Sequence, residues 1–218
     1  YKVERKKWND VDIEIYYDKK HSVNVNKMVK AVERSLEYYT KNFGPYTHKQ
    51  CRIIEFPRFS TFAQAFPGTM PYSEAFGFVI DLEDEEKNNV IDAVIAHEIA
   101  HQLGYAAEEE ANFIAIDAAL QSEDLYMQYA GYHLALGYAL ADCRKRKDID
   151  SKVLYQKLDV GVLKQYQQVS AFWQSYQNPL EPLFKKSYDS YLKANNQTAG
   201  INSYSLVVGL LLHKYQKD

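Results

Sequence analysis

The rest of the chain is organised around one stretch, Val90-Ile91-Asp92-Ala93-Val94-Ile95-Ala96-His97-Glu98-Ile99-Ala100-His101. Apolar residues surround its two histidines, and this pattern predicts a buried helix rather than a surface helix with one polar face. Gly104 is well placed to end that helix. We therefore expect the chain to turn back shortly after His101.

The two histidines and the glutamate between them have the spacing of a metal site. On a helix, His97 and His101 lie about 40° apart around the axis and about one turn apart along it, so both imidazoles can reach one metal ion. Glu98 projects from the edge of the same face, where it can contact a water at the metal without binding the metal itself. Zinc held in this way keeps an open fourth position and requires a third protein ligand. The alternative is a pair of packed core histidines.

A second helical run over residues 107–118 is the expected source of that third ligand. Its first turn holds three glutamates, residues 108–110, and negative charge there favours a helix N-terminus. The preference for negative charge at a helix N-terminus is sufficient to explain Glu108 and Glu109. Glu110 shares a face with Ile114 and Asp117, so we expect it to point inward and to complete the zinc site.

At these residues the chain resembles gluzincin-type zinc metallopeptidases, in which His-Glu-x-x-His, a short turn and Glu-Ala-Asn-x-x-Ala follow one another. The resemblance implies a zincin-like fold, and it places the third ligand at Glu110, the glutamate of Glu-Ala-Asn. From about Ala96 to the C-terminus the chain also resembles an uncharacterised family of bacterial membrane-associated proteins. That likeness includes Tyr129-Ala130-Gly131-Tyr132 and Tyr191-Leu192-Lys193-Ala194-Asn195. It implies a membrane-bound parent protein with this domain on its extracytoplasmic side.

The chain before the histidine helix resembles aminopeptidase-like domains fused to bacterial transporter permeases. In aminopeptidases of that broader type, a glutamate beside the zinc site holds the free amino group of the substrate, and the resemblance implies this role for Glu74. An exposed loop carboxylate is the alternative. Those domains carry their third ligand further beyond the second histidine, where this chain has Ala118-Ala119-Leu120 and no carboxylate. This departure weakens the aminopeptidase likeness and favours Glu110 as the ligand. The sequence motifs behind the likeness are Lys7-Trp8-Asn9-Asp10, Ile53-Ile54-Glu55-Phe56-Pro57, Phe62-Ala63-Gln64-Ala65-Phe66-Pro67 and Tyr72-Ser73-Glu74-Ala75-Phe76-Gly77-Phe78.

A peptidase also needs a hydrogen-bond donor for the oxyanion that develops during the reaction, and a Tyr or His on a later helix suits that role. Among the neighbouring Tyr129, Tyr132 and His133 we select Tyr132. The alternative is that these aromatic side chains fill helix interfaces. Asn112 and Asp117 are candidates to orient a ligand imidazole.

Composition limits the function classes. The chain has 218 residues, of which 46% are hydrophobic, so it can bury a core as one domain. The net charge of -3 and the scattered basic residues exclude a nucleic-acid partner. The longest late apolar stretch, Leu206 to Leu212, is far shorter than a membrane span. Cys51 and Cys143 do not form a disulfide scaffold and do not indicate a compartment.

The first third of the chain predicts strands and one helix. Strands are expected at 11–17, 51–56 and 76–80, and an amphipathic helix is expected at 24–43 before Gly44-Pro45. The segment 57–71 holds Gly68 and three prolines, which favour a long loop.

Beyond residue 88 the pattern is almost entirely helical, with runs near 125–145, 153–176, 183–194 and 204–215. The sequence therefore predicts an α+β fold in one domain, residues 1–218. A small sheet-containing lobe (1–87) precedes a mostly helical lobe (88–218), and the site is expected between the lobes.

These features predict a zinc-dependent metallopeptidase that acts on peptide or protein substrates. His97, His101 and Glu110 would hold Zn²⁺, and Glu98 would act as the general base. The alternative function is a catalytically inactive, zinc-stabilised module that binds peptides or a membrane partner.

Overall fold

The computed structural model describes residues 1–79, 89–175, 181–194 and 206–216. The chain divides into two compact units, Tyr1–Tyr132 and His133–Asp218. The boundary between the two units falls within α4 (Leu125–Lys145). The two helices that carry the candidate site therefore belong to the same unit as the sheet.

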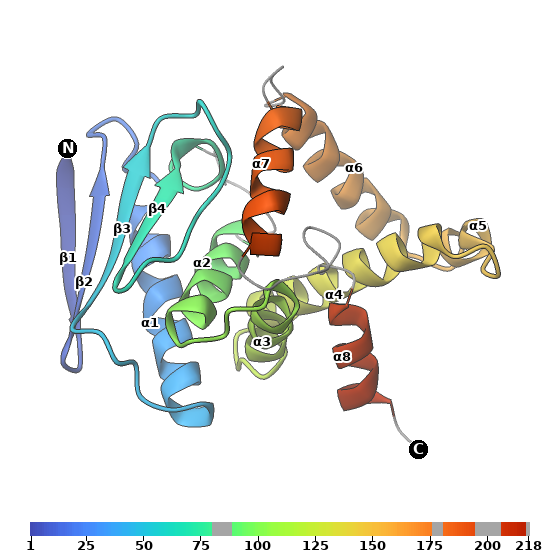
Figure 1. Ribbon diagram of the computed structural model, residues 1–218, viewed down its shortest axis with the longest axis horizontal. Coiled ribbons are helices and arrows are strands. Elements are labelled where there is room, and N and C mark those ends of the chain that lie inside the picture. The colour runs from blue at the N-terminus through green and yellow to red at the C-terminus, as the bar shows by residue number, and fades with distance from the viewer. Residues whose placement is uncertain (80–88, 176–180, 195–205, 217–218) are drawn as a thin grey trace. The chain divides into compact units, whose positions relative to one another are not determined.

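The first unit contains a four-stranded sheet in the order β1-β2-β3-β4 (Figure 1). The strands are β1 (Lys2–Trp8), β2 (Val11–Tyr17), β3 (Gln50–Phe56) and β4 (Thr69–Ser73). β1 and β2 form an antiparallel hairpin, while β2, β3 and β4 are parallel. A sheet followed by helices confirms the predicted α+β class.

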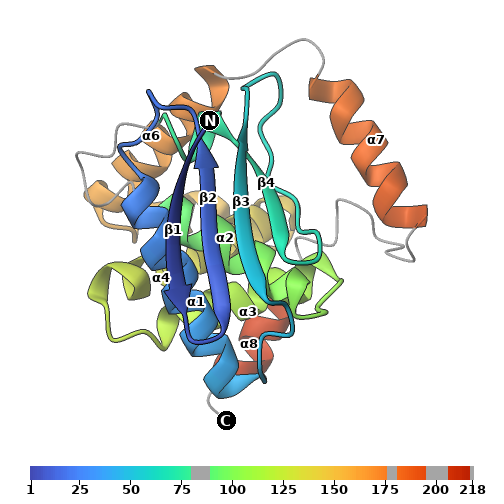
Figure 2. The same cartoon turned by 90° about the vertical axis from the view of Figure 1, so that its left-hand side faces the viewer.

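Helices cover one face of this sheet. In β2 and β3 alternate side chains are buried, among them Ile13, Ile15 and Ile53, as expected for strands with one covered face. α1 (Val25–Asn42) packs into this core with a buried stripe of residues that includes Met28, Val32, Leu36 and Tyr39. Figure 2 shows the other face of the sheet in front, with α1 and α2 behind it.

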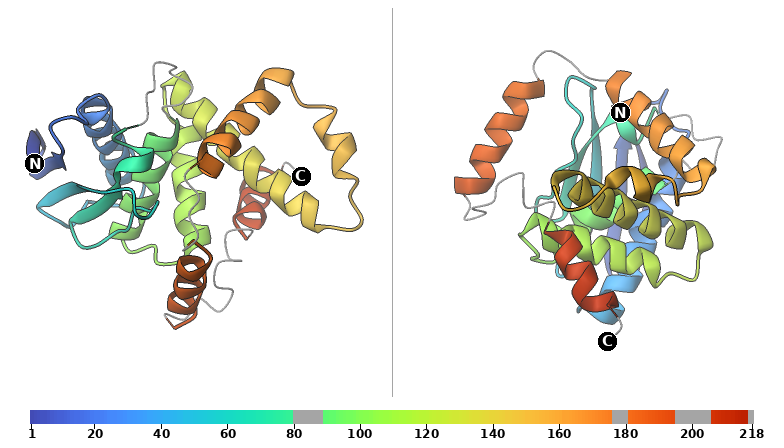
Figure 3. Two further views of the ribbon diagram at one scale, coloured as in Figure 1. Left: turned by 90° about the horizontal axis from the view of Figure 1, so that it is seen from above. Right: turned by 90° about the vertical axis from the view of Figure 1, so that its right-hand side faces the viewer.

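The histidine helix is α2 (Asn89–Gln102), and α3 (Glu108–Leu120) follows it after a short turn. The Tyr39 hydroxyl of α1 donates to the Ala96 carbonyl of α2 at 2.9 Å, inside the core. α2 also packs against α3 (Figure 3, left). Gly104 has a positive φ of 105° just after α2, which confirms its expected role in ending that helix.

The predicted strand at 76–80 is wrong. The fourth strand is β4, inside and just beyond the segment predicted as a loop, and Glu74–Phe76 form the short 3-10 helix η1. Ile80 lies outside the described residues. Segment 62–66 folds back antiparallel beside β4, through bridges Ala63–Tyr72 and Phe66–Thr69. Gly68 makes this tight turn, since its φ is 62° and a Cβ there would lie 2.9 Å from the Gln50 carbonyl oxygen.

The second unit comprises the rest of α4 and four further helices: α5 (Ser151–Tyr155), α6 (Val160–Ser175), α7 (Glu181–Ala194) and α8 (Val207–Tyr215). The run predicted at 153–176 is two helices, because Asp159 caps the start of α6 by accepting from the Gly161 N–H at 2.7 Å. Within the unit, the Tyr166 ring stacks on His133 with centroids 4.1 Å apart. No helix among the described residues is long and apolar enough to cross a membrane.

The covered face of the sheet predicts a contrast between two neighbouring isoleucines of β3. Ile53 is fully buried beneath the helices, whereas Ile54 points to the other face and is partly exposed. Ile53→Ala should lower the free energy of unfolding by about 2–5 kcal/mol because it leaves a cavity in the core. Ile54→Ala should lower the free energy of unfolding by clearly less, about 1 kcal/mol. Urea denaturation followed by circular dichroism measures both values, and equal losses would contradict the assignment of faces.

Candidate metal centre

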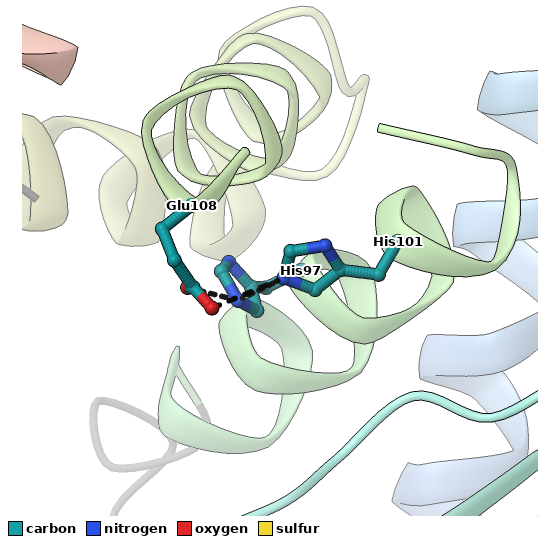
Figure 4. A group of neighbouring side chains, drawn as sticks. All are labelled: His97, His101 and Glu108. Carbon is teal, nitrogen blue, oxygen red and sulfur yellow. Dashed lines mark hydrogen bonds and ion pairs between the residues drawn. The ribbon is translucent and has the colours of Figure 1, made fainter. Parts of the chain in front are cut away.

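The candidate centre is formed by His97 and His101 of α2 and Glu108 at the start of α3 (Figure 4). The two Nε2 atoms of the histidines lie 3.0 Å apart. Glu108 Oε2 lies 3.3 Å from His97 Nε2, and Glu108 Oε1 lies 3.7 Å from His101 Nε2. The two imidazoles therefore meet one carboxylate in a single small space, as the spacing of the histidines predicts.

These separations can be compared with those of a metal shell. A tetrahedral zinc site with bonds of about 2.0–2.1 Å places neighbouring ligand atoms about 3.3 Å apart. The three observed separations of 3.0, 3.3 and 3.7 Å are all within a few tenths of an ångström of that value. Two imidazole nitrogens and one carboxylate also form a ligand set that zinc takes in proteins. The residues present thus fit a zinc ion in both chemistry and spacing.

The orientation of His101 is fixed by its other ring nitrogen. His101 Nδ1 lies 2.7 Å from the Tyr105 carbonyl oxygen, which can only accept. Nδ1 therefore carries a proton, and in the neutral imidazole the lone pair is on Nε2, facing His97 and Glu108. A backbone carbonyl that holds the outer nitrogen of a ligand imidazole is the usual support of a metal-binding histidine.

Glu108, and not Glu110, lies against the histidines. Glu108 is 3% exposed, whereas Glu110 is exposed on the surface of α3. Residues two positions apart on a helix point about 200° apart, so only one of the two can face α2. The predicted third ligand Glu110 is therefore replaced by Glu108 in this cluster.

The helix pattern could not distinguish the two glutamates because α3 is buried nearly all round. From Ala111 to the end of α3 every residue is buried except Phe113 and Leu120, which are partly buried. The face that Glu110 shares with Ile114 and Asp117 was therefore not a distinctive inward face. A sequence feature that points to Glu108 is the stripe of small and polar residues spaced about one turn apart: Glu108, Ala111, Asn112 and Ala115. Asn112 supports this stripe by donating to the Glu108 carbonyl oxygen at 2.7 Å.

Glu98 lies beside the cluster and is 6% exposed. Its carboxylate accepts a hydrogen bond from the Ala65 N–H, while its Oε2 atom has no hydrogen-bond partner among the described residues. Burial raises the pKa of Glu98, and the neighbouring Glu108 adds to this, although the two histidines partly offset it. A buried glutamate with a raised pKa is a stronger base than a surface glutamate.

In the metal-free centre, the charges of Glu108 and Glu98 change the pKa of His101. Burial by itself lowers the pKa of His101, but the hydrogen bond and the negative charge of Glu108, followed by the charge of Glu98, raise it above its usual value overall. The two carboxylates thus favour the protonated form of the His101 imidazole.

Two other predicted site residues lie elsewhere. Tyr132 is 63% exposed on α4, and no hydrogen bond or ion pair within the described ranges joins it to the histidine cluster. Glu74 belongs to a second group with His21 and Glu55, and Arg58 Nε lies 2.9 Å from its carboxylate. Glu74 is thus neither a plain exposed loop residue nor a member of the histidine cluster.

The second group is satisfied by its own partners. Glu55 is buried, accepts a hydrogen bond from the Asp18 N–H and forms a close ion pair with His21 Nδ1. Glu74 has Arg58 as its counter-charge. Because Arg58 and the Asp18 N–H already contact these carboxylates, the contacts of the group are those of a structural network at the ends of β2, β3 and β4.

The fold and the site together define an α+β protein with a buried His-His-Glu centre and an adjacent buried glutamate. The chain belongs to the family described as Protein of unknown function (DUF3810), whose model matches residues 6–212. No curated protein shows significant similarity to it.

Proposed function

We propose that the protein is a zinc-dependent metallopeptidase in which His97, His101 and Glu108 hold the metal and Glu98 is the general base. The observation that carries this proposal is the convergence of both Nε2 atoms and the Glu108 carboxylate within 3.0–3.7 Å of one another. The proposal is further supported by the resemblance of the His-Glu-x-x-His region to zinc peptidases.

The chemistry divides between the metal and the chain. When bound, Zn²⁺ supplies a Lewis acid that polarises a carbonyl group and acidifies water. Glu98 accepts a proton from the attacking water at its carboxylate and transfers it to the nitrogen of the leaving amine as the peptide bond breaks. Its raised pKa suits both steps, because the group must take up and release a proton in turn.

His101 and Glu108 keep their ligand atoms in place through contacts outside the centre. Tyr105 holds His101 in the tautomer that points Nε2 inward. Asn112 donates to the Glu108 carbonyl and so ties the first residue of α3 to the next turn. The chain's own residues thus preorganise two of the three ligands.

The zinc ligands are tested by a matched pair of glutamate variants. Glu108→Gln should weaken Zn²⁺ binding by at least about 100-fold, because even the loss of an outer-shell partner costs about 10- to 100-fold. Glu110→Gln should bind like the parent, since Glu110 is exposed on α3. Competition with a chromogenic chelator measures both affinities, with His97→Ala as the reference for a lost ligand. Equal affinities in the two glutamate variants would remove Glu108 from the site.

The general base is tested by Glu98→Gln, which keeps the size of the side chain but removes its ability to take a proton. Zinc should remain bound, while hydrolysis of a mixed library of synthetic peptides should fall by about 10²- to 10⁴-fold. Both proteins are loaded with one Zn²⁺ per chain before the assay. Cleavage by the variant at the parent's rate would exclude Glu98 as the base.

If the zinc-loaded parent cleaves no peptide in the library, the peptidase proposal fails. The function that then remains is the alternative one, an inactive zinc-stabilised module that binds peptides or a partner protein.

A further inference from the structure

Gln102, the residue directly after His101, makes three hydrogen bonds through its buried side chain. Its Nε2 group donates to the Phe66 carbonyl at 2.9 Å and to the Thr69 carbonyl at 3.2 Å. Its Oε1 atom accepts from the Tyr46 hydroxyl at 2.6 Å. Both N–H groups and the oxygen of the amide are therefore used, and the amide is held in one orientation.

One carbonyl that Gln102 holds belongs to a segment at the edge of the sheet, residues 62–66, which we call the edge arm. The other belongs to Thr69, the first residue of β4. The edge arm pairs with β4 through main-chain hydrogen bonds on one side. The Ser73 N–H donates to the Phe62 carbonyl at 3.0 Å, the Gln64 N–H to the Pro71 carbonyl at 3.2 Å, and the Phe66 N–H to the Thr69 carbonyl at 2.8 Å.

The edge arm reaches the base of the proposed reaction. The Ala65 N–H donates to the Glu98 carboxylate. Glu98 and Gln102 are four residues apart on α2, so they lie on one face about one turn apart. The edge arm is thus fastened to α2 at two neighbouring points, Ala65 to Glu98 and Phe66 to Gln102.

We propose that Gln102 is a positioning residue which, held by Tyr46, fixes the edge arm against α2 and so keeps the Ala65 N–H on the Glu98 carboxylate. Glu98 Oε2 has no hydrogen-bond partner within the described part of the chain, and the hydrogen bond from the Ala65 main chain is the contact that joins the carboxylate to the edge arm. The catalytic part of this inference rests on the proposed function; the contact between the edge arm and α2 does not.

The experiment compares Gln102→Leu with the control Asn24→Leu. Asn24 is also a buried amide of the same unit, and its Nδ2 donates to the carbonyl of Gly77, a residue outside the edge arm, at 2.9 Å. Each variant therefore loses a buried amide-to-carbonyl bond, but only Gln102→Leu removes the bonds to the Phe66 and Thr69 carbonyls. Amide hydrogen exchange at Ala65, bound Zn²⁺, and kcat and KM on the best-cleaved peptide of the library are measured for both variants and the parent.

In Gln102→Leu, exchange at Ala65 should become at least about tenfold faster, because the edge arm opens locally. Zn²⁺ should stay bound, and kcat should fall about 10- to 100-fold with KM little changed, since a misplaced catalytic group costs on the order of 10²-fold. Asn24→Leu should leave Ala65 exchange and kcat near the parent values.

Unchanged Ala65 exchange in Gln102→Leu overturns the proposal, whatever the activity. Faster exchange with unchanged kcat overturns the positioning role. A zinc-loaded parent that cleaves nothing overturns the peptidase function alone, and the Ala65 measurement still decides whether Gln102 holds the edge arm. If Gln102→Leu does not fold, Tyr46→Phe replaces it, because this variant removes the hydrogen bond to the Gln102 oxygen and leaves both bonds of Gln102 Nε2 in place. It should give a smaller change in the same direction, and no change overturns the proposal.

Discussion

The geometry of α2 is the constraint on which the candidate site depends. A helix repeats its faces every three to four residues, so His97 and His101 form one stripe and Glu98 and Gln102 form the stripe beside it. The first stripe meets Glu108 of α3, and the second meets the edge arm at Ala65 and Phe66. A single helix therefore presents metal ligands on one side and a base with its support on the next.

This arrangement requires α2 to be fixed in rotation, because a turn of the helix would take both stripes away from their partners. Contacts on several sides supply that restraint. The Tyr39 hydroxyl of α1 holds the Ala96 carbonyl, Arg34 of α1 forms a close ion pair with Asp92, and Gln102 is bound at the C-terminal end. Packing of apolar residues such as Ile95 and Ile99 fills the space between these polar contacts. The core and the site are thus built by the same helix.

Most elements of the fold could be predicted from the sequence, because their apolar residues follow one clear period. β2, α1, β3 and α4 lie at or within about a residue of their predicted places. β1 could not be recognised, since its charged residues leave no alternation; an edge strand tolerates them, and they protect its open side. β4 and the edge arm were missed because prolines and Gly68 favoured a loop, whereas long-range pairing with β3 overrides that local preference.

In the site, the sequence predicted that the two histidines lie together but not which glutamate of α3 lies against them, because a helix buried nearly all round does not indicate which side faces its neighbour. Charge gives an independent argument for a cation at the position the structure does indicate. Glu98 and Glu108 are both nearly fully buried, and isolated buried carboxylates are costly unless a cation compensates them. His101 Nδ1 is already committed to the Tyr105 carbonyl, so its Nε2 faces the same space as Glu108 and His97 Nε2. A divalent cation held by these three groups would balance the charge of both carboxylates. On the proposed function, the metal ion is therefore the group that would compensate the two buried carboxylates.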